Sequence, residues 1–263
     1  MNSKLKKPCG ARANGPPPSG DKPRLDQLLV ERGLAASREQ AQARILAGEV
    51  FVNGQRRDKP GWRAPHDAHL HLKTAPRYAS RAGDKLAAAL SAFSIPVTGR
   101  VALDVGSSTG GFTDCLLQAG AARVHAVDSG RNQMIYRLRQ DPRVRLRERT
   151  NARYLRPEQV GEPVDIIAVD VSFISATLLF PALLPLLAAN GDLIVLVKPQ
   201  FEAGREAVGK GGIVRDPAAR DAAIARVRQA LEAAGMRVRN VMPSPVLGAE
   251  GNQEFLMWAR FGV

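Results

Sequence analysis

Short apolar runs alternate with stretches of helical period from about residue 77 to the end of the chain. Strands are predicted near residues 100–105, 123–128, 143–148, 164–170, 192–198, 236–242 and 253–260. Helical stretches separate most of them, but only the turn-rich residues 243–251 join the last two. The pattern predicts an α/β domain with a mostly parallel, seven-stranded sheet that ends in an antiparallel hairpin.

A smaller pattern precedes this domain. Leucines recur at helical spacing from Leu25, and residues 37–40 form a capping box that starts a second helix. A short strand at residues 50–52 then meets Asn53-Gly54, a strong hairpin signal. Two helices and a hairpin predict a small α+β domain.

The chain is therefore predicted to have three parts. Residues 1–23 contain eight Pro or Gly and almost no apolar residue, which predicts a disordered basic leader. Residues 24–76 hold the small domain and, from residue 61, a connector. Residues 77–263 form the large domain.

The sequence gives little indication of a metal site, a disulfide framework or a membrane-spanning segment. The histidines at residues 69–72 alternate with leucines, as in a half-exposed strand, so no metal site is expected. Two cysteines make no disulfide framework, and no secretory signal is visible. The most apolar stretch, residues 176–189, contains two prolines and is predicted to be a buried helix, too short to span a membrane. A cytoplasmic protein is expected.

The net charge of +13 is concentrated in the first third of the chain. Residues 1–81 carry 16 Lys or Arg against 7 Asp or Glu, a net +9, and residues 82–263 carry 22 against 18, a net +4. This distribution is expected when one module binds nucleic-acid phosphates, although general basicity is the alternative. The candidate RNA contacts are Arg24, Arg32, Arg38, Arg44, Arg56, Arg57 and Lys59.

A second arginine cluster spans the third predicted strand. Alternation at residues 143, 145, 147 and 149 would place four arginines on one strand face. They either extend an RNA-binding surface or protect an edge strand from aggregation. Both interpretations stay open.

The first predicted strand of the large domain runs into a glycine-rich turn at residues 106–111 and then a helical stretch. This order lets the backbone approach a cofactor closely, and the spacing G-x-x-x-G-G favours S-adenosylmethionine over a dinucleotide. A carboxylate at the end of the second strand can accept hydrogen bonds from ribose hydroxyls, and an amide after the third can meet adenine. The candidate cofactor residues are Asp104, Gly106, Ser107, Gly110, Gly111, Phe112, Asp128 and Asn151.

The motifs together resemble a known family. Residues 24–60 resemble an S4 RNA-binding domain, and residues 77–263 resemble the FtsJ-like ribose methyltransferases. The whole pattern is similar to the TlyA family of haemolysin A-like ribosomal RNA 2′-O-methyltransferases. The matching segments are residues 78–86, 104–113, 170–175, 197–202 and 251–255.

The resemblance implies a Rossmann-like class I methyltransferase fold and S-adenosylmethionine as cofactor. It also implies ribosomal RNA or ribosomal subunits as partner, with methylation of a ribose 2′-hydroxyl, of cytidine, in 16S or 23S RNA. Its catalytic set would be Lys85, Asp170, Lys198 and Glu254.

The chemistry explains these residue types. Lys198 can take the proton of a hydroxyl only as a neutral amine, a form that burial and Lys85 favour and carboxylates oppose. Asp170 and Glu254 are therefore expected to orient the lysines. The competing interpretations are an RNA-binding ribosome-assembly factor without activity, and a pore-forming protein as the haemolysin label suggests.

Overall fold

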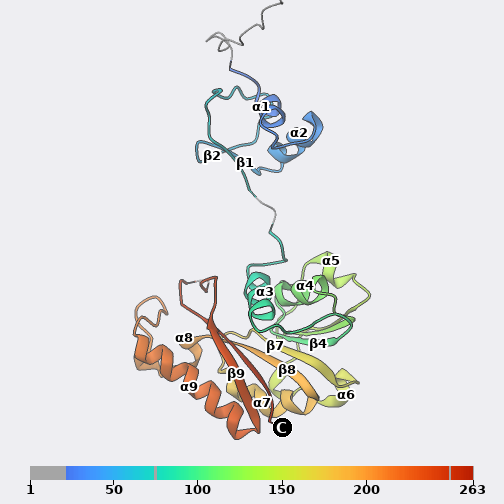
Figure 1. Ribbon diagram of the computed structural model, residues 1–263, viewed down its shortest axis with the longest axis vertical. Coiled ribbons are helices and arrows are strands. Elements are labelled where there is room, and N and C mark those ends of the chain that lie inside the picture. The colour runs from blue at the N-terminus through green and yellow to red at the C-terminus, as the bar shows by residue number, and fades with distance from the viewer. Residues whose placement is uncertain (1–21, 74–75, 249, 263) are drawn as a thin grey trace, which may run out of the picture. The chain divides into compact units, whose positions relative to one another are not determined.

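The computed structural model describes residues 22–73, 76–248 and 250–262. The chain divides into two compact units, Met1–Ala75 and Pro76–Val263, called here the small unit and the large unit (Figure 1). The predicted disordered leader lies outside the described residues except for Lys22 and Pro23.

The small unit is built from two helices and a three-stranded sheet. Its strands are antiparallel, in the order β2-β1-β3. Leu25, Leu28 and Leu29 pack with Ile45 and Val50 in a core of this unit alone. The elements are α1 (Leu25–Glu31), α2 (Arg38–Leu46), β1 (Val50–Val52), β2 (Gln55–Arg57) and β3 (Leu70–Leu72).

Local signals in this unit were informative. Asn53 and Gly54 have φ of 50° and 78°, which the predicted hairpin turn requires. The Ser37 hydroxyl accepts from the Gln40 amide at 3.2 Å, as in a capping box. The reciprocal bond differs, because the Gln40 side chain accepts from the Ala36 amide at 2.7 Å.

The predicted connector is wrong for residues 61–72, which belong to the small unit. Ala64 and Ala68 are buried in its core, with Trp62 packed against them, and β3 pairs with β1. Ala64 and Ala68 are the buried positions of this stretch, and they attach it to the core of the small unit. Among the described residues, no group of three or more His, Cys, Asp or Glu could hold a metal ion.

The large unit confirms the predicted fold class. Its seven strands run in the order β6-β5-β4-β7-β8-β10-β9. β10 is antiparallel to both neighbours, and the other pairs are parallel. The strands are β4 (Val101–Val105), β5 (Arg123–Val127), β6 (Val144–Arg147), β7 (Val164–Val169), β8 (Leu187–Val197), β9 (Met236–Pro243) and β10 (Phe255–Phe261).

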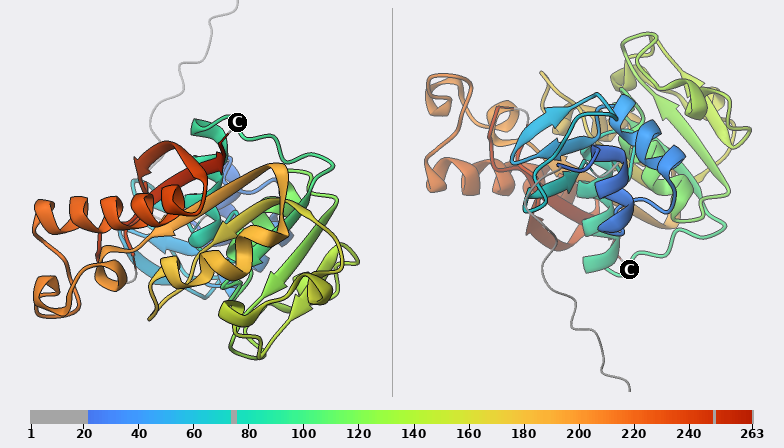
Figure 2. Two further views of the ribbon diagram at one scale, coloured as in Figure 1. Left: turned by 90° about the horizontal axis from the view of Figure 1, so that it is seen from below. Right: turned by 90° about the horizontal axis from the view of Figure 1, so that it is seen from above.

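Helices cover both faces of this sheet (Figure 2). Along β4, Leu103 and Val105 pack with α7 and α9, whereas Ala102 packs with α3 and α4, as the alternation of side chains on a strand requires. The helices are α3 (Ala82–Ala92), α4 (Gly111–Gln118), α5 (Tyr136–Arg139), α6 (Pro157–Val160), α7 (Phe180–Leu183), α8 (Pro199–Glu202) and α9 (Pro217–Ala233), with 3-10 turns η1 (Ala152–Tyr154), η2 (Ala176–Leu179), η3 (Leu184–Leu186) and η4 (Arg205–Ala207).

The helix predicted over residues 176–189 is not continuous. The segment forms η2, α7 and η3 in turn, and β8 already begins at Leu187. Pro181 and Pro185 lack the amide hydrogens that an uninterrupted helix needs. No helix in the described part of the chain is long and apolar enough to cross a membrane.

The arginine alternation is present at the sheet edge. Arg145 and Arg147 are exposed on β6, and Arg143 and Arg149 beside it are exposed too. β6 is the first strand of the sheet order and has one neighbour, β5. Both interpretations of this stripe, RNA contact and edge protection, stay predictions.

One buried carboxylate joins distant parts of the large unit. Asp192 on β8 is fully buried and accepts from Arg100 at 2.8 Å, from Trp258 at 2.7 Å and from Arg260 at 2.6 Å. Burial alone would raise the pKa of Asp192, but the bonds from Arg260, Arg100 and Trp258 outweigh it and lower the pKa. The ionised carboxylate therefore links the strand β8 to β10 and to the segment before β4.

Replacing this carboxylate should destabilise the large unit. We expect Asp192→Asn to lower the free energy of unfolding by about 2–3 kcal/mol at pH 7, because two guanidinium groups lose their charged partner. The stabilisation is present above the unfolded-state pKa of about 3.9 and is lost as the pH falls through the lower folded-state value. The difference between wild type and variant should therefore shrink below about pH 4. Denaturant unfolding at several pH values measures it.

The matched control is Asp221→Asn, which removes the same charge from an exposed position on α9. Its effect should stay within about 0.5 kcal/mol at every pH. Equal stability of the Asp192→Asn variant and the wild type at pH 7 would contradict the proposed linking role.

Candidate active site

The site lies where three parallel strands end side by side. β4, β7 and β8 are neighbours in the sheet, and Gly106, Asp170 and Lys198 follow their carboxyl ends. Gly106 has φ of 86°, and a Cβ there would overlap the carbonyl oxygen of Asp170. Only glycine therefore allows the loop after β4 to lie against the segment after β7.

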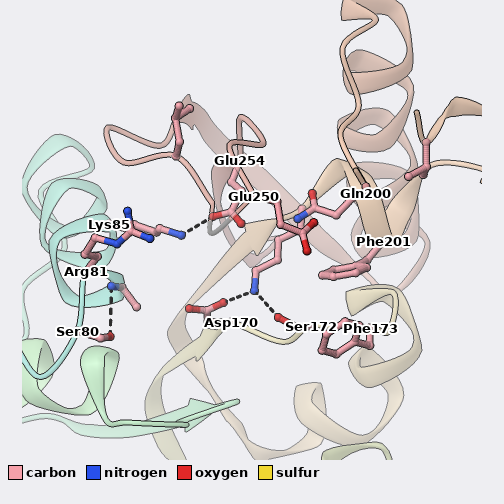
Figure 3. A pocket seen from close by; sticks show the side chains of 15 residues that line it. Ser80, Arg81, Lys85, Asp170, Ser172, Phe173, Gln200, Phe201, Glu250 and Glu254 are labelled. Atoms are coloured by element: carbon pink, nitrogen blue, oxygen red, sulfur yellow. Dashed lines mark hydrogen bonds and ion pairs between the residues drawn. The ribbon is translucent and has the colours of Figure 1, made fainter. Parts of the chain in front are cut away.

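Lys198 and Asp170 form an ion pair at this edge. Lys198 Nζ lies 2.7 Å from Asp170 Oδ1 and donates to the Ser172 hydroxyl oxygen at 2.9 Å (Figure 3). Lys198 is 9% exposed. Two of the hydrogen-bonding directions of this ammonium are therefore set by residues of the segment after β7.

Glu254 and Lys85 form a second pair. The antiparallel register sets Phe255 opposite Val197, so Glu254, directly before β10, lies at the level where β8 ends. Lys85 comes from α3, and its Nζ lies 2.5 Å from Glu254 Oε2, with both residues buried. All four predicted catalytic residues line one cavity of about 500 Å³.

Two smaller cavities adjoin this one. They have volumes of about 330 Å³ and 170 Å³, and Asp170 and Ser172 line all three. Of these three cavities, Lys198 lines the largest and the smallest. A ligand in the smaller cavities and one in the largest would meet at these side chains.

Six of the eight predicted cofactor residues line the smaller cavities. The smallest is lined by Gly106, Ser107, Gly111 and Phe112, and the other by Gly106, Asp128 and Asn151. Asp128 accepts from the backbone amides of Ser108 and Gly130, each at 2.7 Å. The side-chain oxygen Oδ1 of Asn151 accepts from the backbone amide of Arg153 at 3.0 Å.

The other two predicted cofactor residues line none of the three cavities. Asp104 is fully buried and accepts from the Thr113 hydroxyl at 2.6 Å. Burial raises the pKa of Asp104 to about 7, although the Thr113 bond opposes the shift. Gly110 caps α4 with φ of 97°, and a Cβ there would overlap Leu138. Asp104 therefore bonds β4 to α4, and Gly110 allows the loop to pack against Leu138.

The cavities suit S-adenosylmethionine. The Ser107 hydroxyl is buried, lines the smallest cavity and has no hydrogen-bond partner in the described structure. The amino-acid end of the cofactor would satisfy it, while its ribose would lie within reach of Asp128. A cofactor with a polar group at each end therefore fits the residues present.

Several lining residues within the matching motifs had no role assigned from sequence. Phe173 is 92% exposed with φ of 67°, and its ring lies 5.4 Å from that of Phe201. Gln200 has a buried side-chain oxygen without a partner. Phe173 and Gln200 both line the cavity of about 500 Å³. In the sequence, only their nearness to Asp170 and Lys198 pointed to a place in the site.

Glu202 holds two of these segments together. Its carboxylate accepts from the Ser175 hydroxyl at 2.5 Å and from the Ala176 amide at 2.7 Å. Burial raises the pKa of Glu202 despite these bonds. The segment that carries Asp170 is thereby attached to α8, directly after Lys198.

The predicted RNA contacts of the small unit are all exposed or partly exposed. Arg24 and Arg38 both bind the carboxylate of Asp26. The guanidinium of Arg57 lies 4.5 Å from the centre of the Trp62 ring. The remaining contacts are Arg32, Arg44, Arg56 and Lys59.

Comparison with known proteins agrees with this arrangement. The FtsJ-like methyltransferase family model matches residues 78–261, and the S4 domain model matches residues 23–68. The 16S/23S rRNA (cytidine-2′-O)-methyltransferase TlyA of Mycobacterium tuberculosis is 45% identical over 239 residues, 90% of this chain and 89% of that protein. Hemolysin A of Brachyspira hyodysenteriae is 41% identical over 234 residues, 89% of this chain and 98% of that protein.

A solved structure leads to the same conclusion. It is described as "Putative hemolysin from Streptococcus thermophilus" and is 43% identical, with a TM-score of 0.69. The match covers 91% of this chain and 88% of the other. The chain therefore belongs to the FtsJ-like methyltransferases and, with its S4 domain, to the TlyA family.

Proposed function

We propose that the protein transfers a methyl group from S-adenosylmethionine to the 2′-hydroxyl of a cytidine ribose in 16S or 23S ribosomal RNA. The observation that carries this proposal is the meeting of three cavities at Asp170 and Ser172, with Lys198 beside them. The target follows the name of the TlyA relative, which is 45% identical.

The two smaller cavities hold the cofactor. Ser107 binds its amino-acid end, Asp128 accepts from its ribose hydroxyls, and Asn151 lies at its adenine edge. When bound, S-adenosylmethionine supplies an electrophilic methyl group. The cavity of about 500 Å³ is left for the nucleotide that receives this methyl group.

The cavity of about 500 Å³ suits a nucleotide taken out of its stack. Phe173 exposes its ring at the cavity wall, and aromatic rings bind unstacked bases. Its positive φ is uncommon for a bulky residue and indicates a conformation that the surrounding structure enforces. Gln200 adds a buried acceptor without a partner, which a ligand donor would satisfy.

Lys198 is placed to take the proton of the 2′-hydroxyl. Asp170 and Ser172 occupy two directions around its Nζ, and a neutral amine would direct its lone pair into the cavity. Lys85, held by Glu254, adds a positive charge that stabilises the developing alkoxide. Holding the hydroxyl in line with the methyl group contributes too, because near-attack geometry is worth roughly 7–11 kcal/mol in favourable cases.

The cofactor proposal predicts a binding defect. We expect Asp128→Ala to weaken S-adenosylmethionine binding by about tenfold or more, because a charged acceptor for the ribose hydroxyls is lost. Titration calorimetry measures this, with Glu158→Ala, an exposed residue on α6, as the control. NADH should give no binding heat, and tight binding of NADH would overturn the assignment.

The catalytic proposal predicts loss of turnover with binding retained. Lys198→Ala should abolish methyl transfer, and Lys198→Arg should fail too, because a guanidinium stays protonated. Lys85→Ala and Asp170→Ala should also be severe and non-additive with Lys198→Ala, since the groups act as a unit. The assay is transfer of labelled methyl to ribosomal RNA, with mass spectrometry of the resulting ribose-methylated nucleosides.

The control measurements are cofactor and RNA affinity, which should change little in the Lys198 and Lys85 variants; Asp170 also lines the proposed cofactor cavities, so Asp170→Ala is not used for this control. Near-normal turnover of Lys198→Arg would show that the lysine is not the base. Positioning alone would then carry the reaction.

The division of labour predicts an effect of the small unit on RNA affinity. Because its core is separate, a fragment of residues 76–263 should keep cofactor affinity and bind ribosomal RNA at least about tenfold more weakly. Binding by the full chain should fall steeply between roughly 50 and 200 mM salt as phosphate contacts are screened. Fluorescence anisotropy measures both, and salt-independent affinity would contradict the proposal.

A further inference from the structure

A single buried carboxylate organises one surface of the small unit. Asp26 lies in the first turn of α1 and is fully buried. Its Oδ1 accepts from Arg24 Nε at 3.1 Å and from the Gln27 amide at 3.0 Å. Its Oδ2 accepts from Arg24 Nη2 and Arg38 Nε, each at 3.0 Å, and from the side-chain nitrogen Nε2 of Gln42 at 2.9 Å.

The carboxylate is charged in this setting. The hydrogen bond from Arg24 holds the pKa of Asp26 far below its usual range, and bonds from Gln42 and Arg38 act in the same direction against burial. One bidentate arginine would already pair the charge. The second arginine is therefore not needed to neutralise Asp26, and its placement calls for another explanation.

Both arginines keep donors for an external partner. Their side chains are 39% and 48% exposed. A guanidinium has five N–H donors; Asp26 takes two from Arg24 and one from Arg38, which leaves three and four. Within the part of the chain that the structure describes, no other hydrogen bond occupies these donors, so they can meet an anion while Asp26 holds the other side of each group.

The shared oxygen also limits the separation of the two charges. Arg24 Nη2 and Arg38 Nε each lie 3.0 Å from Asp26 Oδ2, so they are no more than 6.0 Å apart. Two cations this close repel each other unless a negative charge lies between them. One phosphate group can accept from both guanidinium groups at this spacing, and guanidinium matches phosphate oxygens in a bidentate manner.

We propose that Asp26 is a positioning residue that holds Arg24 and Arg38 as a ready-formed pair for one phosphate of the RNA backbone. This inference rests on the proposed binding of RNA by the small unit. It assigns the gain to preorganisation, because ordering two long side chains in advance lowers the entropy cost of binding.

The sign of one substitution separates this role from simple charge attraction. Asp26→Asn makes the small unit one charge more positive, so attraction alone predicts tighter RNA binding. Positioning predicts weaker binding, by about tenfold, and a salt slope smaller by roughly one unit, as for a lost phosphate contact. The control Asp58→Asn removes the same charge from an exposed residue of the same unit and should bind equally well or more tightly.

The probe is labelled, in vitro transcribed 16S and 23S ribosomal RNA, titrated with the full-length protein by fluorescence anisotropy at several salt concentrations. Circular dichroism and thermal melting report whether each variant stays folded. Arg38→Lys is the second variant: it keeps the charge of an exposed side chain, leaves Arg24 on Asp26 and removes the planar fork. It should weaken binding about as much as Asp26→Asn without lowering the melting temperature.

Weaker binding by both variants together with unchanged or tighter binding by Asp58→Asn supports the proposal. Binding by folded Asp26→Asn as tight as wild type overturns it. If Asp26→Asn unfolds, wild-type affinity of Arg38→Lys overturns it instead. Absence of salt-dependent RNA binding by the wild type would overturn the proposed RNA-binding role itself, and with it this inference.

Discussion

The active edge of the large unit depends on one close backbone approach, between Gly106 and the carbonyl of Asp170. The Asp170 amide donates to the Val105 carbonyl at 2.9 Å, so the two chain segments are joined directly after their strands. This contact makes Asp170 a shared wall of all three cavities. A side chain at residue 106 would separate the glycine-rich loop from Asp170 and from Lys198, which pairs with Asp170.

Charge placement in the protein follows from the cost of burial. Lys198 and Lys85 are nearly buried, and each has its own carboxylate within 2.7 Å. An unpaired buried ammonium would be costly, and pairing it also limits its motion. The same rule acts on Asp192 and Asp26, which are charged because arginines surround them. Among the described residues no arginine or lysine pairs with Asp104, and burial raises its pKa to about 7.

The mostly parallel sheet with its closing antiparallel hairpin, and the placement of Asp170 and Lys198 at strand ends, could be predicted because the alternation of strands and helices is visible in local sequence. Parallel strands end at one edge, so Asp170 and Lys198 had to lie close together. The partner of Lys85 could not be predicted from periodicity, because it depends on the register between β10 and β8 and on how α3 packs. The prediction of a connector over residues 61–72 was wrong for a similar reason, because burial of Ala64 and Ala68 is a property of the folded core.

The contrast between the two units shows why motif and composition are complementary. In the large unit, the proposed chemistry rests on single residues at or near strand ends, and short motifs pointed to these residues. In the small unit, the proposed RNA contacts are mostly arginines, and counting charges could not distinguish one from another. The geometry does so, because Arg24 and Arg38 share one carboxylate whereas Arg57 lies over the Trp62 ring. An acidic residue, which lowers the net charge, is thus the feature that gives part of the basic surface a defined shape.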